Sequence, residues 1–236
     1  MPKKKSKKKS PWHSIRRLSK IAAATALILS LAVTLVLRWV PPPTSAFMLR
    51  QRLSGHPVDY RWVPLKRISP QAALAVIASE DQNFFDHWGF DMGAIADAIE
   101  ENRSRKHPRG ASTISQQVAK NLFLWPQRSY LRKGIEAYFT LLMELLWPKK
   151  RILEVYLNIA EMGKNVFGVG AAARRFFHRP AARLNRREAA TLAAVLPDPR
   201  DMNANRPSAY VVERRGQIIG QMKALGGIGF LRHNGL

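Results

Sequence analysis

The chain has 236 residues, a formal net charge of +23 and no cysteine. The lack of cysteine excludes disulfide bonds and thiolate catalysis, and the length suits one domain of ordinary size with short appendages. A strongly basic chain favours an anionic partner such as a nucleic acid, a membrane surface or a phosphate-bearing substrate.

The first 20 residues form a basic tail, which is followed by an apolar run. The tail holds nine Lys or Arg and no acidic residue, and the run from Ile21 to Leu37 is uncharged. At about 1.5 Å per residue, this run spans about 26 Å as a helix, enough for a bilayer core. We expect a cytoplasmic tail at 1–20 and a transmembrane anchor at 21–40, with everything after Pro41 outside the cytoplasm.

Two other interpretations of this end of the chain are weaker. A cleaved signal peptide would need a small-residue cleavage site, which the segment 38–43 lacks, and the apolar run is long for a signal peptide. A lysine-rich tail can also contact nucleic-acid phosphates, but the adjacent apolar run explains the tail better. We therefore expect a membrane partner and no nucleic acid. The remaining net charge of +14 suits anionic lipid headgroups.

The rest of the chain predicts a mainly α fold. We expect a linker and membrane-proximal segment at 41–57 and one domain at 58–236, which opens with a short strand at 58–63. Proline and glycine positions delimit the predicted helices. These helices lie near 70–83, 91–103, 113–124, 130–146, 149–162, 168–177, 186–196 and 208–224.

The helix predicted at 70–83 carries adjacent carboxylates near its C-terminal end. Ser69 suits the N-cap and Pro70 the first helical position, which puts Glu80 where the helix macrodipole is negative. Ionisation of Glu80 should be disfavoured there, and a raised pKa suits a general base. The alternative is that Glu80 and Asp81 only bond to a turn or to a nearby arginine.

Two further clusters supply polar and cationic groups. In Gly110–Asn121, Thr113 and Gln116 have capping-box spacing, and a helix start with free N–H groups would form half of an anion site. The same segment supplies hydrogen-bond donors suited to phosphate or sugar hydroxyls, from Ser112, Gln117, Lys120 and Asn121. In the next cluster, Arg128, Arg132, Lys133 and Glu136 have helical spacing. The alternative for this cluster is a solvated helix start with ordinary ion pairs.

Five segments in order resemble the signatures of the peptidoglycan glycosyltransferases. They are Glu80–Gly89, with Phe84 and His87 in their motif positions, Gly110–Asn121, Arg132–Glu136, Lys149–Asn158 and Ala172–Ala193. The resemblance covers roughly residues 58 to 225. It implies a lysozyme-like helical head with a small mobile jaw lobe, and a catalytic domain in the periplasm anchored to the inner membrane of a Gram-negative bacterium.

The resemblance also implies an activity, the polymerisation of lipid II into linear glycan strands by inverting transfer, with release of undecaprenyl pyrophosphate. Glu80 would be the general base, and Glu136 would either hold a divalent cation, Mg²⁺ or Mn²⁺, or orient the basic groups. Partners would be lipid II, the growing strand and other proteins of cell-wall synthesis. The expected substrate-binding residues are Asp81, Phe84, His87, Ser112, Thr113, Gln116, Gln117, Lys120, Asn121, Arg128, Arg132 and Lys133.

Several roles stay open at this point. His87 suits a hydrogen bond that supports the Glu80 loop, and Glu154, Tyr156 and Asn158 suit supports that orient the groove. The basic segment 103–109 is either a flap over the groove or a solvated loop.

Two other functions compete with polymerisation. A lytic transglycosylase or lysozyme-like hydrolase would use Glu80 as a general acid. The second glutamate among basic residues argues against it, because cutting neutral glycan needs no pyrophosphate site. An inactive membrane scaffold is the other alternative. A transpeptidase is excluded, since the one Ser-x-x-Lys match, at Ser6 and Lys9, lies in the tail.

Overall fold

The computed structural model describes residues 11–101, 103 and 110–236, and the chain divides into two compact units, Met1–Val40 and Pro41–Leu236. Within its described residues, 11–40, the first unit contains one helix, α1 (Pro11–Leu37). Its part from Ile15 to Leu37 contains an 18-residue window with a mean hydropathy of 2.2 and is long and apolar enough to cross a membrane. The helix begins before the uncharged run, because it includes the second half of the basic tail.

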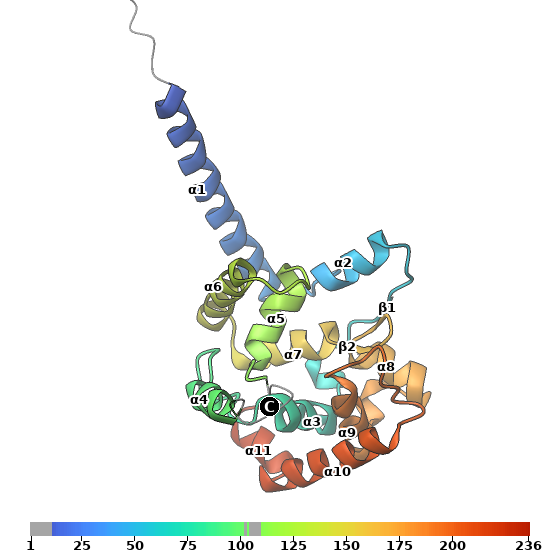
Figure 1. Cartoon of the computed structure of the whole chain (residues 1–236). Helices are drawn as coiled ribbons and strands as arrows, with labels where there is room; N and C mark the ends of the chain where they lie inside the picture. The colour runs from blue at the N-terminus through green and yellow to red at the C-terminus, as the bar shows by residue number, and fades with distance from the viewer. Residues whose placement is uncertain (1–10, 102, 104–109) are drawn as a thin grey trace, which may run out of the picture. The chain divides into compact units, whose positions relative to one another are not determined.

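The second unit is mainly helical, as predicted (Figure 1). All eight predicted helices are present, most of them shorter by one to three residues at an end. Two short helices were not predicted, α2 in the expected linker and α11 near the C-terminus. The helices of this unit are α2 (Ala46–Leu53), α3 (Pro70–Glu80), α4 (Met92–Glu101), α5 (Ile114–Phe123), α6 (Tyr130–Leu146), α7 (Lys149–Ile159), α8 (Gly168–Phe177), α9 (Arg186–Val195), α10 (Ala209–Ala224) and α11 (Ile228–His233), with 3₁₀ turns η1 (Leu65–Arg67) and η2 (Ala181–Arg183).

A three-stranded sheet of order β1-β3-β2 joins distant parts of this unit. The predicted strand at 58–63 is reduced to β1 (Asp59–Tyr60), which pairs in parallel with β3 (Val166–Phe167). β2 (Glu161–Gly163) pairs with β3 in antiparallel fashion. The chain then turns into α8 at Gly168, whose φ is +80° and where a Cβ would lie 2.3 Å from a backbone oxygen. Only glycine fits there.

Helix α3 lies at the centre of the unit, where it contacts α7, α9, α10 and α11 (Figure 1). Its residues 72–78 are all buried, and four of the seven are alanines, which lets the neighbouring helices approach closely. At the N-terminal end, the Ser69 hydroxyl accepts a hydrogen bond from the Gln71 N–H and donates one to the Leu184 carbonyl. Because α3 ends at Glu80, this side chain emerges at the edge of the core.

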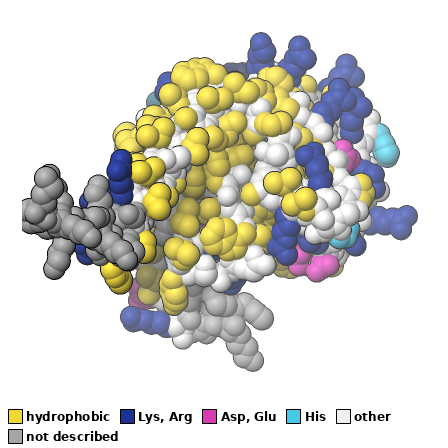
Figure 2. Space-filling model, turned by 90° about the horizontal axis from the view of Figure 1, so that it is seen from above, with side chains coloured by type: hydrophobic (Ala, Val, Ile, Leu, Met, Phe, Trp, Pro, Cys, Tyr) yellow, Lys and Arg dark blue, Asp and Glu magenta, His cyan; other side chains and the backbone are white. Residues whose placement is uncertain are grey.

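A second group of helices surrounds α5, which contacts α2, α6 and α7. The segment 41–57, expected as a linker, therefore belongs to the compact unit through α2. In and next to α5 and α6, Leu124 and Trp147 are buried, while Leu141 and Leu145 are exposed. The space-filling view shows hydrophobic side chains over a broad area and Lys and Arg side chains near it (Figure 2).

Candidate active site

A cleft of about 990 Å³ lies where α3 ends, and it places Glu80 in its wall. The other walls come from α4, the start of α5 and one side of α10. This volume is at the upper end of the range for ligand sites. Sequence-predicted site residues that line the cleft are Glu80, Asp81, Ser112, Thr113 and Gln117.

The Glu80 carboxylate is held by neutral donors. Its Oε2 accepts a hydrogen bond of 2.8 Å from the Gln117 amide, and its Oε1 accepts a longer one of 3.5 Å from the Ser79 hydroxyl. Burial raises the pKa of Glu80 and outweighs the Gln117 bond and the charges of Arg214 and Lys120, which lower it. The direction agrees with the sequence prediction, but burial is the main cause rather than the helix end.

Gln117 is itself fixed by a second residue behind it. The Tyr156 hydroxyl donates to Gln117 Oε1 over 3.1 Å, which turns the amide nitrogen of Gln117 towards Glu80. Burial, followed by the charges of Glu80 and Asp81, raises the pKa of Tyr156 well above its ordinary value, so the hydroxyl stays a donor. Tyr156, Gln117 and Glu80 thus form one directed chain of hydrogen bonds.

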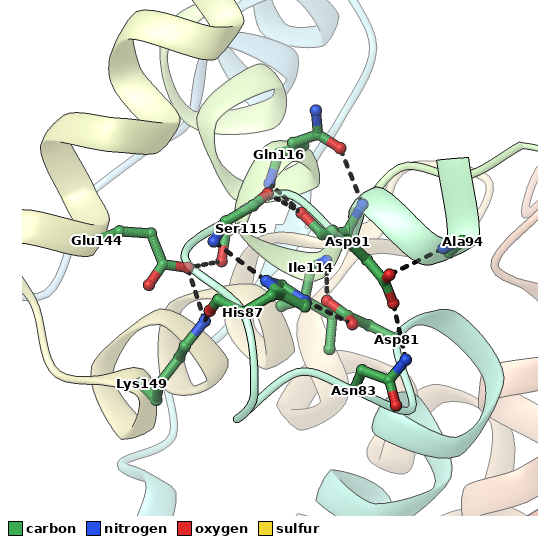
Figure 3. A network of polar contacts seen from close by, with 12 residues as sticks. Asp81, Asn83, His87, Asp91, Ala94, Ile114, Ser115, Gln116, Glu144 and Lys149 are labelled. Carbon is green, nitrogen blue, oxygen red and sulfur yellow. Dashed lines mark hydrogen bonds and ion pairs between the residues drawn. The ribbon is translucent and has the colours of Figure 1, made fainter. Parts of the chain in front are cut away.

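Asp81 ties two segments together (Figure 3). Its Oδ1 lies 2.9 Å from His87 Nε2, and its Oδ2 accepts from the Ile114 N–H at 2.9 Å, at the start of α5. His87 Nδ1 accepts from the Gly89 N–H, so Nε2 is the nitrogen that donates to Asp81. His87 therefore has the supporting role that sequence analysis favoured. Both oxygens of Asp81 are used inside the protein rather than presented to a ligand.

At the start of α5, backbone N–H groups also form hydrogen bonds within the protein. Thr113 and Gln116 form the predicted capping box, and the Thr113 hydroxyl donates to the Gly89 carbonyl. The N–H groups of Thr113, Ile114 and Gln116 all have side-chain acceptors within the protein. The expectation that this helix start offers free N–H groups to an anion is therefore wrong, because the capping box and Asp81 occupy them. Gln116 is buried and is a cap rather than a substrate contact.

Sequence analysis missed the network around Lys149, which supports the loop after Glu80 from below (Figure 3). Lys149 Nζ donates to the His87 carbonyl at 2.6 Å and to Glu144 Oε1 at 2.8 Å, and Glu144 also accepts from Ser115. The same ammonium lies 4.7 Å from the centre of the Phe84 ring. Phe84 is fully buried under it, which corrects the expectation that Phe84 contacts substrate. The only sequence signal was the place of Lys149 in a signature.

Glu136 has an environment opposite to that of Glu80. It is 3% exposed, and its two oxygens lie 2.5 Å from Arg132 Nη1 and from Lys133 Nζ. Burial lowers the pKa of Lys120, while the charge of Glu136 raises it, so Lys120 belongs to the same electrostatic cluster. Arg132 also donates through Nε to the Gln127 carbonyl. The predicted helical spacing from residue 132 to 136 is realised as a buried ion pair.

The fit of a metal ion to Glu136 is poor. Each carboxylate oxygen already accepts from a cation, and in the described part of the chain no three His, Cys, Asp or Glu side chains form a group that could hold a metal. Mg²⁺ and Mn²⁺ prefer several oxygen ligands. The side chains present favour the other expectation, in which Glu136 orients Arg132 and Lys133.

A second cavity of about 220 Å³ adjoins the cleft, and Gln117 lines both. Its charged lining consists of Lys120 and Arg200 together with the carboxylates of Glu161 and Asp198, and Asn121 also lines it. Gln117 therefore lies between Glu80 and the cavity that contains Lys120. The exposed Arg128 and the cluster of Arg132, Lys133 and Glu136 do not line either of these two cavities. The residues Arg105, Lys106, His107 and Arg109 of the expected flap lie outside the described part of the chain.

Two more groups complete the surroundings. Glu154 accepts from the Leu65 N–H, and Asn158 bonds to both backbone groups of Val63, so they hold the segment before α3 as expected of supports. Sequence analysis missed the cleft-lining side of α10. The sequence signal that could have revealed it is a helical spacing of polar and aromatic residues. These residues are Tyr210, Glu213, Arg214, Gln217 and Gln221.

Comparison with known proteins identifies the family of the chain. The model of the family described as Transglycosylase matches residues 48–223. A biosynthetic peptidoglycan transglycosylase of Pseudomonas entomophila is 56% identical over 208 residues, covering 86% of this chain and 88% of the relative. Proteins of the same name from Pseudomonas putida and Pseudomonas syringae pv. syringae are 53% and 54% identical, covering 92% and 86% of this chain and 94% and 89% of the relatives. The chain therefore belongs to the transglycosylase family.

Proposed function

We propose that the chain polymerises lipid II into linear peptidoglycan strands, with Glu80 as the general base. The observation that carries this proposal is the environment of Glu80. It is a carboxylate with a raised pKa in the wall of a large cleft, held by Gln117 and Ser79, with the cation Lys120 in the adjoining cavity. The base and Lys120, the cation proposed to meet the leaving anion, lie on either side of Gln117.

The reaction is one displacement at an anomeric carbon. The Glu80 carboxylate takes the proton of the acceptor's 4-hydroxyl, and the hydroxyl oxygen attacks C1 of the donor sugar. The bond between C1 and the pyrophosphate oxygen breaks, and its electron pair leaves with the undecaprenyl pyrophosphate. A single attack opposite the leaving group inverts C1 and forms a β-1,4 bond. Holding both sugars in the cleft makes this step effectively unimolecular.

Negative charge grows on the departing pyrophosphate, so fixed cations nearby should lower the barrier. Lys120 is the nearest candidate because it lines the cavity beside Gln117. Arg132 and Lys133 are held on Glu136, which keeps the pair in place at the start of α6. Arg128 is exposed and could reach the lipid-linked phosphate from outside. Ser112, Gln117 and Asn121 would position the donor.

The same proposal includes a location. One apolar helix at the N-terminal end fits a single-pass membrane protein. We assign it to the inner membrane, with the N-terminus in the cytoplasm and the catalytic unit in the periplasm, because the lysine-rich tail follows the positive-inside bias. Other proteins of cell-wall synthesis are the expected partners, and no nucleic acid is expected.

The test offers the purified full chain in detergent two substrates in separate reactions, lipid II and isolated cell-wall sacculi. We expect polymeric glycan and free undecaprenyl pyrophosphate from lipid II, and no soluble fragments from sacculi. Release of soluble fragments from sacculi with no polymer from lipid II would identify a lytic enzyme. If neither substrate reacts, the scaffold interpretation gains and this proposal fails.

A further inference from the structure

The side of α10 that lines the cleft has no role in the reaction described above. Tyr210, Arg214, Gln217 and Gln221 all line it, with spacings of four, three and four residues. Such spacing places side chains on one face of a helix. At about 1.5 Å per residue, this face extends about 16 Å along the helix axis. We refer to these four residues as the α10 polar face.

Helix α10 also carries a stripe of buried apolar residues, each one position after a residue of the polar face. This stripe holds the polar face in place. Val211, Ile218 and Met222 are buried, since α10 packs against α9 and α3. A shift of one residue turns a helix by about 100°, so the polar face lies beside the packed face. The packing fixes the rotation of α10 and therefore fixes which side chains face the cleft.

The side chains of the polar face are partly connected to one another. Arg214 donates to Gln217 Oε1 at 3.1 Å, and the Gln217 amide donates to Glu213 Oε1 at 3.4 Å. Gln221 differs, because its Oε1 is buried and has no hydrogen-bond partner within the protein. A buried acceptor without a partner destabilises the folded protein. Because this oxygen has almost no exposed surface, a hydroxyl or amide N–H of a ligand in the cleft reaches it only when the Gln221 side chain moves.

The charge of the cleft limits which ligand group can lie there. In the part of the chain that the structure describes, five carboxylates and one guanidinium, that of Arg214, line the cleft. A pyrophosphate would be repelled by this lining. The cationic groups of the site belong instead to the cluster of Lys120, Arg132 and Lys133. The five carboxylates are those of Glu80, Asp81, Asp91, Asp97 and Glu213.

We propose that the α10 polar face binds the uncharged saccharide part of the glycan substrate, through Arg214, Gln217 and Gln221, with Tyr210 against a sugar ring. This inference rests on the proposed function and names the wall that aligns the sugars with Glu80. Planar amides and a guanidinium match the hydroxyl and N-acetyl groups of a sugar, which both donate and accept. The acidic lining and the cationic cluster together would fix the direction of the substrate, with sugars along α10 and diphosphate towards α5 and α6.

The position of Arg214 near the base supports this assignment. Arg214 and Glu80 both line the cleft, and the charge of Arg214 lowers the pKa of Glu80. A sugar hydroxyl held by Arg214 would therefore lie close to the carboxylate that must receive a proton. Gln221 lies two helical turns further along the face and would hold a more distant part of the glycan.

A binding experiment tests the proposal without the reaction. Chitotetraose, a neutral tetramer of N-acetylglucosamine, is added to the full chain in detergent micelles, and the side-chain amide signals of Gln217 and Gln221 are followed by NMR. We expect both signals to shift, and we expect inorganic pyrophosphate not to displace the sugar. Loss of about one hydrogen bond in Arg214→Ala or Gln221→Leu should weaken binding by about tenfold. The control is Lys223→Ala, which removes the same charge from an exposed position on α10 outside the cleft.

Steady-state kinetics on lipid II then separates this inference from the proposed function. In Gln221→Leu and Arg214→Ala the KM should rise by about three- to tenfold, with a smaller change in kcat, because the lost contacts are mainly binding contacts. Thermal unfolding of each variant excludes a folding defect as the cause. Polymer formation with unchanged KM and no chitotetraose shifts would overturn the inference alone. A parent chain that makes no polymer would overturn the proposed function instead.

Discussion

Glu80 and Glu136 are both largely withdrawn from solvent, yet their surroundings differ in one respect that separates their chemistry. Glu80 receives its hydrogen bonds from an amide and a hydroxyl, and burial raises its pKa. Each carboxylate oxygen of Glu136 forms an ion pair, one with Arg132 and the other with Lys133. A carboxylate with neutral partners can accept a proton, whereas one that neutralises an arginine and a lysine serves to hold them.

The comparison extends to the spaces around them. Glu80 faces a cleft whose described lining is rich in carboxylates, and Glu136 lies on α6 among cations. Gln117 and Pro197 line both the cleft and the small cavity that contains Lys120, and Gln117 is the polar side chain of the two. In the proposed mechanism, this arrangement separates proton transfer from stabilisation of the leaving group. Each prediction below alters one side of this separation.

The largest effect is expected from Glu80→Gln. The amide keeps the shape but cannot accept the proton of the acceptor hydroxyl, so the rate of polymer formation should fall by about 10²–10⁴-fold. Release of undecaprenyl pyrophosphate from lipid II measures it. Asp201→Asn, an exposed carboxylate outside the cleft, is the matched control and should keep the parent rate. Undiminished activity in Glu80→Gln would remove the assigned base.

The same variant should leave the fold intact. Because the folded pKa of Glu80 is raised, its ionised form costs stability, and this cost appears as the pH rises from the unfolded pKa through the folded one. Glu80→Gln should therefore be at least as stable as the parent at neutral pH, and the difference should vanish at acidic pH. Thermal unfolding across this pH range measures it. A variant that unfolds early at neutral pH would instead indicate a structural role.

The next effect is expected from Glu136→Gln. Two cations lose their partner, and removing one member of a buried ion pair costs about 3–5 kcal/mol where both groups are buried. Lys133 is about half exposed, so the loss should be smaller than this, while Arg132 is displaced. We expect a lower melting temperature and a fall of about 10–100-fold in polymerisation, as for a lost positioning group.

The dependence of activity on divalent cations distinguishes the two roles considered for Glu136. Activity is measured for parent and variant after chelation and again with added Mg²⁺ or Mn²⁺. If Glu136 orients the cations, the metal concentration for half-maximal activity should be the same in both proteins. A large increase of that concentration in Glu136→Gln would support the metal-ligand role over the orienting one.

A smaller effect is expected from Gln117→Leu, which removes the amide that lies between the two regions. The Gln117 bond lowers the pKa of Glu80, so its loss should raise that pKa further. A general base works in its ionised form, and the acidic limb of the pH–rate profile should therefore move to higher pH. Gln51→Leu, in α2 and outside both cavities, is the control. An unmoved limb would show that Glu80 does not determine it.

Local sequence features predicted those parts of the site that depend on neighbours in the chain. Ser69 and Pro70 fixed the start of α3 and hence the place of Glu80, and the capping box of Thr113 and Gln116 fixed the start of α5. The ion pair between residues 132 and 136 followed from helical spacing. In each case the partners are within four residues of each other, so the helix geometry alone brings them together.

The features that sequence analysis missed depend on contacts across the fold. The carboxylate of Asp81 accepts a hydrogen bond from the N–H of Ile114, 33 residues away. This N–H at the start of α5 was expected to bind an anion. Phe84 lies in a signature but is buried under Lys149. The side of α10 that faces the cleft could be found only once its packing on α9 and α3 was known. Spacing shows which residues share a face, but not what that face meets.

The smallest effect is expected from Tyr156→Phe, which acts on Glu80 through Gln117. Tyr156 does not touch the carboxylate, and it holds the Gln117 amide so that its nitrogen faces Glu80. Without the hydroxyl the amide can turn, and the hydrogen bond that lowers the pKa of Glu80 is made for only part of the time. The acidic limb should move in the same direction as in Gln117→Leu but less far, with a rate change of about twofold at the optimum. In the double variant the shift should equal that of Gln117→Leu alone, because Tyr156 then has no amide to orient. Additive shifts would show that Tyr156 acts on the cleft by a separate route, and the directed chain from Tyr156 to Glu80 would have to be abandoned.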